Sequence, residues 1–168
     1  MKLQEIDKKR YRKHLNQVIV ACVVALTAGS LGLAQVLIQL FPDPDGSHFH
    51  WNLSGVIVSV IVIALVLKKY KHHPYMTEVT YVWELKQSLN KITRKMRKLK
   101  AAAEQGNLDA MIAIQYSYAG SRQLWQLDDN TITMDELAIW QAELDSLAAK
   151  YHVEPKAEQY HPGLLDKF

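Results

Sequence analysis

The chain has 168 residues, 49% of them hydrophobic, and its 20 Lys and Arg outnumber its 17 Asp and Glu, for a formal net charge of +3 at pH 7. The charges are segregated, since residues 14–67 contain no Lys or Arg. This apolar third must be buried, which excludes a single soluble domain and a mainly disordered chain. The single cysteine also excludes a disulfide framework.

The first apolar segment, residues 14–41, predicts a transmembrane helix that follows a basic N-terminal segment, residues 1–13. As a helix it would extend about 42 Å, which exceeds a hydrocarbon core of roughly 30 Å, so we expect it to tilt or to emerge at its ends. A lipoprotein signal ending at Cys22 or a signal-peptidase site after Ala34 is the alternative, but the apolar residues continue past both positions.

Residues 51–67 predict a second transmembrane helix, with Trp51 suited to the membrane interface and Lys68 and Lys69 closing the run. A buried core helix is the alternative for so short a segment. Lys and Arg flank the two segments, whereas the turn between them, residues 42–50, contains neither. The positive-inside rule therefore predicts that both termini lie in the cytoplasm.

Small residues recur along both predicted spans. They are Ala21, Ala25 and Gly29 in the first and Gly55 and Ser59 in the second. Small side chains at this spacing allow helix backbones to approach closely. The pattern favours packing of the two spans as a hairpin within one chain, and a dimer seam is the alternative. Neither span contains Asp, Glu, Lys or Arg, which argues against a proton relay, an ion pump or a voltage sensor.

The turn between the spans contains four residues that could ligate a metal ion, Asp43, Asp45, His48 and His50. The two histidines are only two positions apart, and so short a turn offers no evident groups to orient them. Acidic residues with Pro and Gly are typical of ordinary turns. We therefore expect no metal and no other cofactor.

After a basic juxtamembrane linker, residues 68–76, the sequence predicts a cytoplasmic module of about three helices over residues 77–151. The first helix, residues 77–105, has apolar residues at spacings of three and four, which indicates an amphipathic helix facing its own domain or a coiled coil. Gly106 and Asn107 end this helix. Its central apolar residues are Leu89, Ile92, Met96 and Leu99.

A second helix is predicted from residue 107 or 108 to about residue 127, and a third begins at a capping box formed by Thr133 and Glu136. Residues 101–120 resemble one unit of the Sel-like relatives of the tetratricopeptide repeat, which implies a helical hairpin and transfers no activity. We expect the tail, residues 152–168, to be extended, with draping over the domain as the alternative to a free segment. We expect the central residues of the first helix to be buried against a second copy or against Leu137, Trp140, Leu144 and Leu147.

Charge is also segregated within the predicted module. Residues 86–100 carry seven bases, including Arg94, Lys95, Arg97 and Lys98, and no acid. Residues 104–168 carry eleven acids and four bases, for a net charge of −7. We expect the acidic helices to pack against the basic helix and neutralise it. Anionic lipid is the alternative partner, and nucleic acid is not expected, because no recognised binding module accompanies the bases.

The sequence has no Walker loop, no Gly-rich dinucleotide turn, no Ser or Cys nucleophile motif and no zincin motif, so we do not expect an enzyme. The opening MKLQEIDKKRYRKHLNQVIV, the two spans and the length resemble a family of bacterial inner-membrane proteins known only as a domain of unknown function. The resemblance covers nearly the whole chain. It implies a small two-span protein of the cytoplasmic membrane of a Gram-negative bacterium, and it implies no activity or ligand.

These observations predict an all-α fold, with a two-helix transmembrane hairpin and a cytoplasmic bundle or coiled-coil hairpin of about three helices. The function favoured is that of a non-enzymatic, membrane-anchored interaction or scaffold protein whose module binds another protein or a second copy. The alternative is an accessory subunit or lipid-associated factor of an inner-membrane complex, acting through the spans and the basic helix, residues 86–100.

Overall fold

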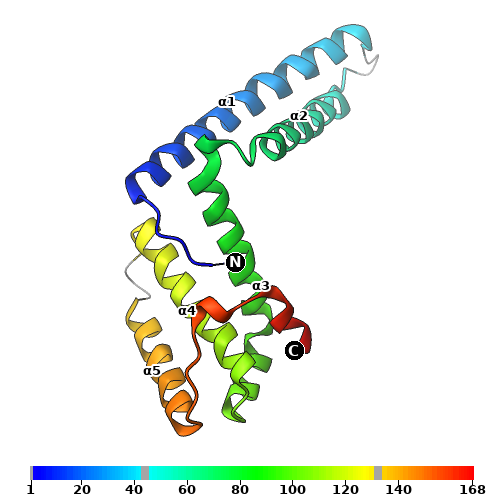
Figure 1. The fold of residues 1–168 in the computed structure, drawn as a ribbon. Helices are drawn as coiled ribbons and strands as arrows, with labels where there is room; N and C mark the ends of the chain where they lie inside the picture. The colour runs from blue at the N-terminus through cyan, green and yellow to red at the C-terminus, as the bar shows by residue number, and fades with distance from the viewer. Residues whose placement is uncertain (1, 43–45, 131–133) are drawn as a thin grey trace. The chain divides into compact units, whose positions relative to one another are not determined.

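The computed structural model describes residues 2–42, 46–130 and 134–168, and all its regular elements in these ranges are helices (Figure 1). The all-α prediction is therefore confirmed. Asp43 and Asp45 of the turn between the spans, and Thr133 of the expected capping box, lie outside the described residues. The α-helices are α1 (Lys8–Leu40), α2 (Phe49–Tyr70), α3 (Thr77–Glu104), α4 (Leu108–Asp128) and α5 (Met134–Lys150). The short 3-10 helices are η1 (Pro74–Met76), η2 (Ala157–Gln159) and η3 (Pro162–Lys167).

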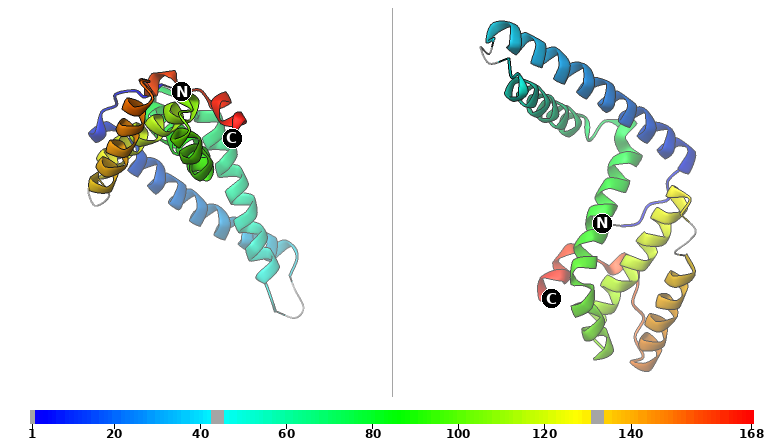
Figure 2. Two further views of the ribbon diagram at one scale, coloured as in Figure 1. Left: turned by 90° about the horizontal axis from the view of Figure 1, so that it is seen from below. Right: turned by 180° about the vertical axis from the view of Figure 1, so that it is seen from behind.

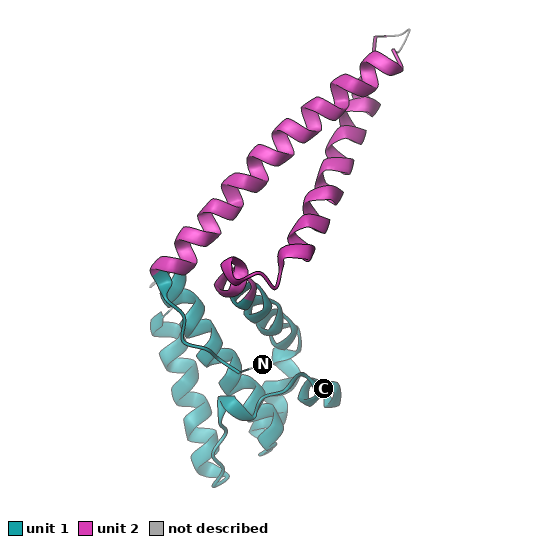
Figure 3. Cartoon of the chain, turned by 45° about the horizontal axis from the view of Figure 1, so that its top comes forward, with its two compact units in different colours: residues 1–8, 81–168 teal, residues 9–80 magenta. Residues whose placement is uncertain are grey.

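The chain forms two compact units (Figure 3). We call residues 9–80 the hairpin unit, because α1 and α2 make up most of it. We call residues 1–8 and 81–168 the module unit. The segment before α1 belongs to the second of these, since the main-chain N–H of Gln4 donates to the Tyr81 hydroxyl at 2.8 Å and Lys8 pairs with Asp129.

Helices α1 and α2 are both long and apolar enough to cross a membrane. Only 6% of the most apolar window of α1 and 11% of that of α2 is buried within the chain. A core helix of a soluble domain buries most of its apolar side chains, so these fractions argue against the core-helix alternative for residues 51–67. Both helices extend beyond the predicted apolar segments, α1 to Lys8 and α2 to Tyr70.

Local signals explain where α3 ends and α4 begins. Gly106 has a φ of +84°, and a Cβ at this position would lie 2.7 Å from the Tyr151 ring, so both the conformation and the space require glycine. The side chain of Asn107 then caps α4 by accepting a hydrogen bond from the main-chain N–H of Ala110 at 3.0 Å. The break predicted at these two residues is confirmed.

Helix α4 is the centre of the module unit and lies between α3 and α5 (Figure 2). It contacts α3 at Gly120, where a Cβ would lie 3.0 Å from a methyl group of Leu89. It contacts α5 through the Tyr118 and Trp140 rings, whose centroids are 6.2 Å apart. Its buried residues are Ala110, Met111, Ile112, Ala113, Ile114, Tyr116, Ser117, Tyr118, Gly120, Leu124 and Leu127. The core of this unit is therefore built around α4.

The apolar seam of α3 faces this core. Leu89, Ile92 and Leu99 are buried, and Met96 is half-buried. On α5, Leu137 and Leu144 are buried, whereas Trp140 and Leu147 are half-buried. The expected direct pairing of the two seams is corrected by the position of α4 between them. The described contacts between α3 and α5 lie near the C-terminal end of α3, where Lys100 lies over the Trp140 ring.

The tail corrects a second expectation, because much of it forms 3-10 helices and is not extended. Part of it is buried, as expected of a tail draped over the domain. It contains η2 and η3, and Tyr160, Leu164 and Leu165 are 4–6% exposed. The Tyr160 ring stacks on the buried ring of Tyr116, with their centroids 4.2 Å apart. Short 3-10 turns have no apolar period of 3.6 or 2 residues, so periodicity could not reveal this packing.

The buried seam leads to a matched pair of isoleucine substitutions. Ile92 is 0% exposed and Ile139 on α5 is 61% exposed. We expect Ile92→Ala to lower the free energy of unfolding of the module unit by roughly 2–5 kcal/mol, because it opens a cavity in the core. Ile139→Ala should change it by about 0.5 kcal/mol or less. Denaturant titration of the full chain in detergent, followed by near-UV circular dichroism, measures both, and equal effects would contradict the seam.

Candidate interaction surfaces

Three of the predicted small residues join α1 to α2 within the chain. A Cβ on Gly55 would lie 2.6 Å from the main-chain oxygen of Ser30 and 3.1 Å from the main-chain nitrogen of Ala34. A Cβ on Gly29 would lie 3.0 Å from the Ser59 hydroxyl, and Ser59 is only 4% exposed. The helices approach this closely because these positions lack larger side chains. Gly29, Gly55 and Ser59 therefore form the contact of a hairpin.

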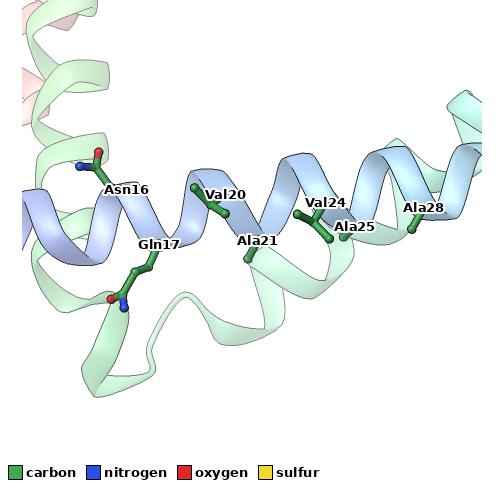
Figure 4. A pocket seen from close by; sticks show the side chains of 7 residues that line it. All are labelled: Asn16, Gln17, Val20, Ala21, Val24, Ala25 and Ala28. Atoms are coloured by element: carbon green, nitrogen blue, oxygen red, sulfur yellow. The ribbon is translucent and has the colours of Figure 1, made fainter.

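The other two predicted small residues lie elsewhere. Ala21 and Ala25 are exposed, and they line a shallow groove along α1 (Figure 4). The other lining residues are Asn16, Gln17, Val20, Val24 and Ala28. Gln17 is engaged at one end of this groove, where its side-chain oxygen accepts a hydrogen bond from the Tyr75 hydroxyl. The five small residues thus divide between a contact inside the hairpin and an outer apolar surface of α1.

The bases of α3 are neutralised much less by acidic helices than the sequence led us to expect. Among the described residues, one ion pair joins residues 86–100 to an acid on α4 or α5, the 3.2 Å contact between Lys86 and Asp128. Lys95 instead donates to the main-chain oxygen of Leu165, and Lys98 donates to that of Phe168, both at 2.6 Å. These two hydrogen bonds hold the tail against α3.

Three further bases of this segment have no ion pair in the described part of the chain. Lys91, Arg94 and Arg97 are all exposed. Two acids at the ends of α4 pair with bases outside this segment, Asp129 with Lys8 and Asp109 with Lys167. The outer surface of α3 is therefore strongly positive.

A buried cluster in the hairpin unit was not found by sequence reasoning. Glu78, in the first turn of α3, is 8% exposed, and its carboxylate lies 2.9 Å from the Nε of Arg10. The other carboxylate oxygen lies 3.6 Å from Nδ1 of His14, whose ring stacks on Tyr75 at 4.0 Å. From sequence alone, the bases before the first span indicate orientation and not a buried ion pair. Arg10 and His14 are four positions apart, which places them on one face of a helix. This spacing is the sequence signal that could have indicated the cluster.

Tyrosines in the module unit serve the core. Burial raises the pKa of Tyr116 to about 12. Burial likewise raises the pKa of Tyr160, which stacks on it. Both phenols therefore stay neutral at physiological pH, which suits their role in packing the tail against α4.

The comparisons with known proteins identify a family. A family model described as "Protein of unknown function (DUF3087)" matches residues 1–165. No curated protein and no solved structure matches the chain.

The hairpin contact leads to a matched pair of glycine substitutions. Gly55→Val places atoms against the backbone of α1, whereas Gly32 has nothing within 4 Å of its Cβ position. We expect Gly55→Val to cost roughly 1–3 kcal/mol of packing and to separate the helices, and Gly32→Val to do neither. Spin labels at Val24 and Val62, both exposed, report the separation as an electron–electron distance in a Cys22→Ser background. Unchanged distances in the Gly55 variant would rule out this seam.

Proposed function

The chain belongs to the DUF3087 family of proteins of unknown function, and we propose that it is a non-enzymatic interaction protein anchored in the inner membrane of a bacterium. The hairpin unit spans the membrane twice. The module unit lies in the cytoplasm and binds another protein or a second copy of the chain.

The observation that carries the proposal is the exposed apolar surface of α1 and α2. Val20, Val24 and Leu31 on α1 are each 61% exposed, and Leu65 on α2 is 60% exposed. Transfer of such a surface from water to hydrocarbon is favourable by about 25 cal/mol for each Å². The backbone of both segments is already satisfied by helical hydrogen bonds, as a bilayer requires.

Orientation is supported by the distribution of bases. Lys and Arg are concentrated before the first span and directly after the second, at Lys68, Lys69 and Lys71. Residues 42–50 contain none. Positive flanks are retained on the cytoplasmic side, so this pattern favours a cytoplasmic location for residues 2–13 and for everything after α2.

An interaction role is supported by the architecture of the module unit. Its core is filled by packing side chains of α3, α4, α5 and the tail, and its outer surface presents apolar side chains. Ile139 is 61% exposed on α5 between the exposed Ala138 and Ala142, and Leu108 is 39% exposed at the start of α4. These exposed apolar side chains are the positions at which we propose that a protein partner makes contact.

The membrane part of the proposal predicts a topology. Reporter fusions after Lys71 and after Phe168 should both report the cytoplasm, and a fusion at Ser47 should report the opposite side of the membrane. The reason is the retention of the basic flanks on the cytoplasmic side. Compartment-specific reporters, such as a phosphatase and a fluorescent protein, give the readout. An external location for the fusion after Phe168 would contradict the two-span anchor.

The interaction part predicts discrete cross-links. A photoreactive amino acid at Ile139 or Leu108, in the full chain in its own membrane, should give a defined adduct with a protein, because both positions are exposed. The same amino acid at Ile92 serves as the control, since this position is 0% exposed and should give no intermolecular adduct. If no exposed position of the module unit yields an adduct, the interaction role is wrong.

A further inference from the structure

One face of α3 is both exposed and basic. Its exposed residues include positions 83, 87, 90, 94 and 97, whose spacings of four and three place them on one side of a helix. The opposite side carries the buried residues Leu85, Ile92 and Leu99. We call the bases on the outer side the basic face, which consists of Lys91, Arg94, Arg97 and Lys98.

The charge of the basic face is not balanced on the face itself. Three of its members, Lys91, Arg94 and Arg97, have no ion pair among the described residues, whereas Lys98 donates to an oxygen of Phe168. Arg94 lies three positions from both Lys91 and Arg97 and four from Lys98, so like charges are neighbours on the helix surface. Such pairs destabilise a helix, and an anionic partner relieves the repulsion. The basic face is therefore suited to binding an anion-rich surface.

Two observations indicate which anionic surface this is. Helix α3 begins at Thr77, seven residues after α2 ends at Tyr70, so a chain anchored by α2 is tethered close to lipid headgroups. Trp83 is 53% exposed on the same side of α3 as the basic face. An exposed tryptophan beside a row of bases is typical of helices that lie at a membrane interface.

We infer that the basic face of α3, with Trp83, docks on anionic phospholipid headgroups of the cytoplasmic leaflet. The inference rests on the proposed function, because it requires the chain to be anchored in a membrane. It assigns lipid phosphate as the partner of Lys91, Arg94 and Arg97, which have no ion pair among the described residues. Each base at an anionic surface contributes about a fivefold increase in the docking equilibrium, so three contribute on the order of a hundredfold.

The experiment uses the full chain in nanodiscs of phosphatidylcholine alone or mixed with phosphatidylglycerol. A spin label at Asn90, an exposed position of the basic side, reports proximity to lipids that carry a nickel chelate. A label at Ile139 on α5 is the positional control, and Cys22 is replaced by Ser in both. We expect phosphatidylglycerol to increase relaxation at Asn90 and not at Ile139. Raising the salt to about 1 M should abolish the increase, since the Debye length falls to about 3 Å.

Two triple variants separate this face from overall charge. Lys91→Gln, Arg94→Gln and Arg97→Gln together should lower the docking equilibrium by on the order of a hundredfold. The matched control, Arg122→Gln, Lys150→Gln and Lys156→Gln, removes the same charge from α4, α5 and the tail and should leave the signal at Asn90 unchanged. Equal losses in both variants would overturn the assignment to this face.

Other outcomes would overturn either the lipid docking or the membrane anchor. Relaxation at Asn90 that does not depend on phosphatidylglycerol would overturn docking on anionic lipid. So would an RNA oligonucleotide that binds the nanodiscs through the basic face and is not displaced by phosphatidylglycerol, because it assigns the bases to nucleic acid. A chain that fails to enter nanodiscs overturns the proposed membrane anchor, whereas a chain that enters without any response to phosphatidylglycerol overturns the lipid docking alone.

Discussion

The burial of α4 is the constraint on which the module unit depends. This helix supplies buried residues from Ala110 to Leu127, so it cannot be stable unless other elements cover it on several sides. Helix α3 covers it with its apolar seam, α5 covers it with Leu137 and Leu144, and the tail adds Tyr160. Because these elements bury most of their apolar side chains against α4, their outward surfaces are mainly polar. The surface chemistry of the module therefore follows from its core.

The sequence allowed the helices to be predicted well and their neighbours poorly. The break at Gly106 and Asn107 was predictable, since it depends on the backbone conformation and the capping of a few adjacent residues. The apolar seam of α3 was predictable from its period. The element that covers this seam was not predictable, because a period shows that one side of a helix is buried but not which element buries it. The helix predicted as one half of a hairpin, α4, proved to lie between the two expected partners.

The tail and the basic segment illustrate a different limit. A matching net charge in two segments suggested that acids and bases would pair, yet Lys95 and Lys98 bind main-chain oxygens of the tail. Every residue carries such an oxygen, so residue types alone cannot reveal this kind of partner. The division of the small residues was equally invisible to spacing. Gly29 and Gly55 lie at the contact between α1 and α2, whereas Ala21 and Ala25, in the same pattern, face outward.

The cluster around Glu78 connects the start of α3 to the basic segment before the first predicted span. Its carboxylate is buried, and a buried carboxylate requires a compensating charge, which Arg10 on α1 supplies at 2.9 Å. One of the bases expected to set membrane orientation thus also neutralises an acid inside the hairpin unit. This dual use leaves the expected orientation unchanged, because the positive-inside rule depends on Lys and Arg and little on Asp and Glu. A base that flanks an apolar segment can therefore also serve packing. In α3, likewise, Lys95 and Lys98 hold the tail, whereas Lys91, Arg94 and Arg97 have no ion pair among the described residues.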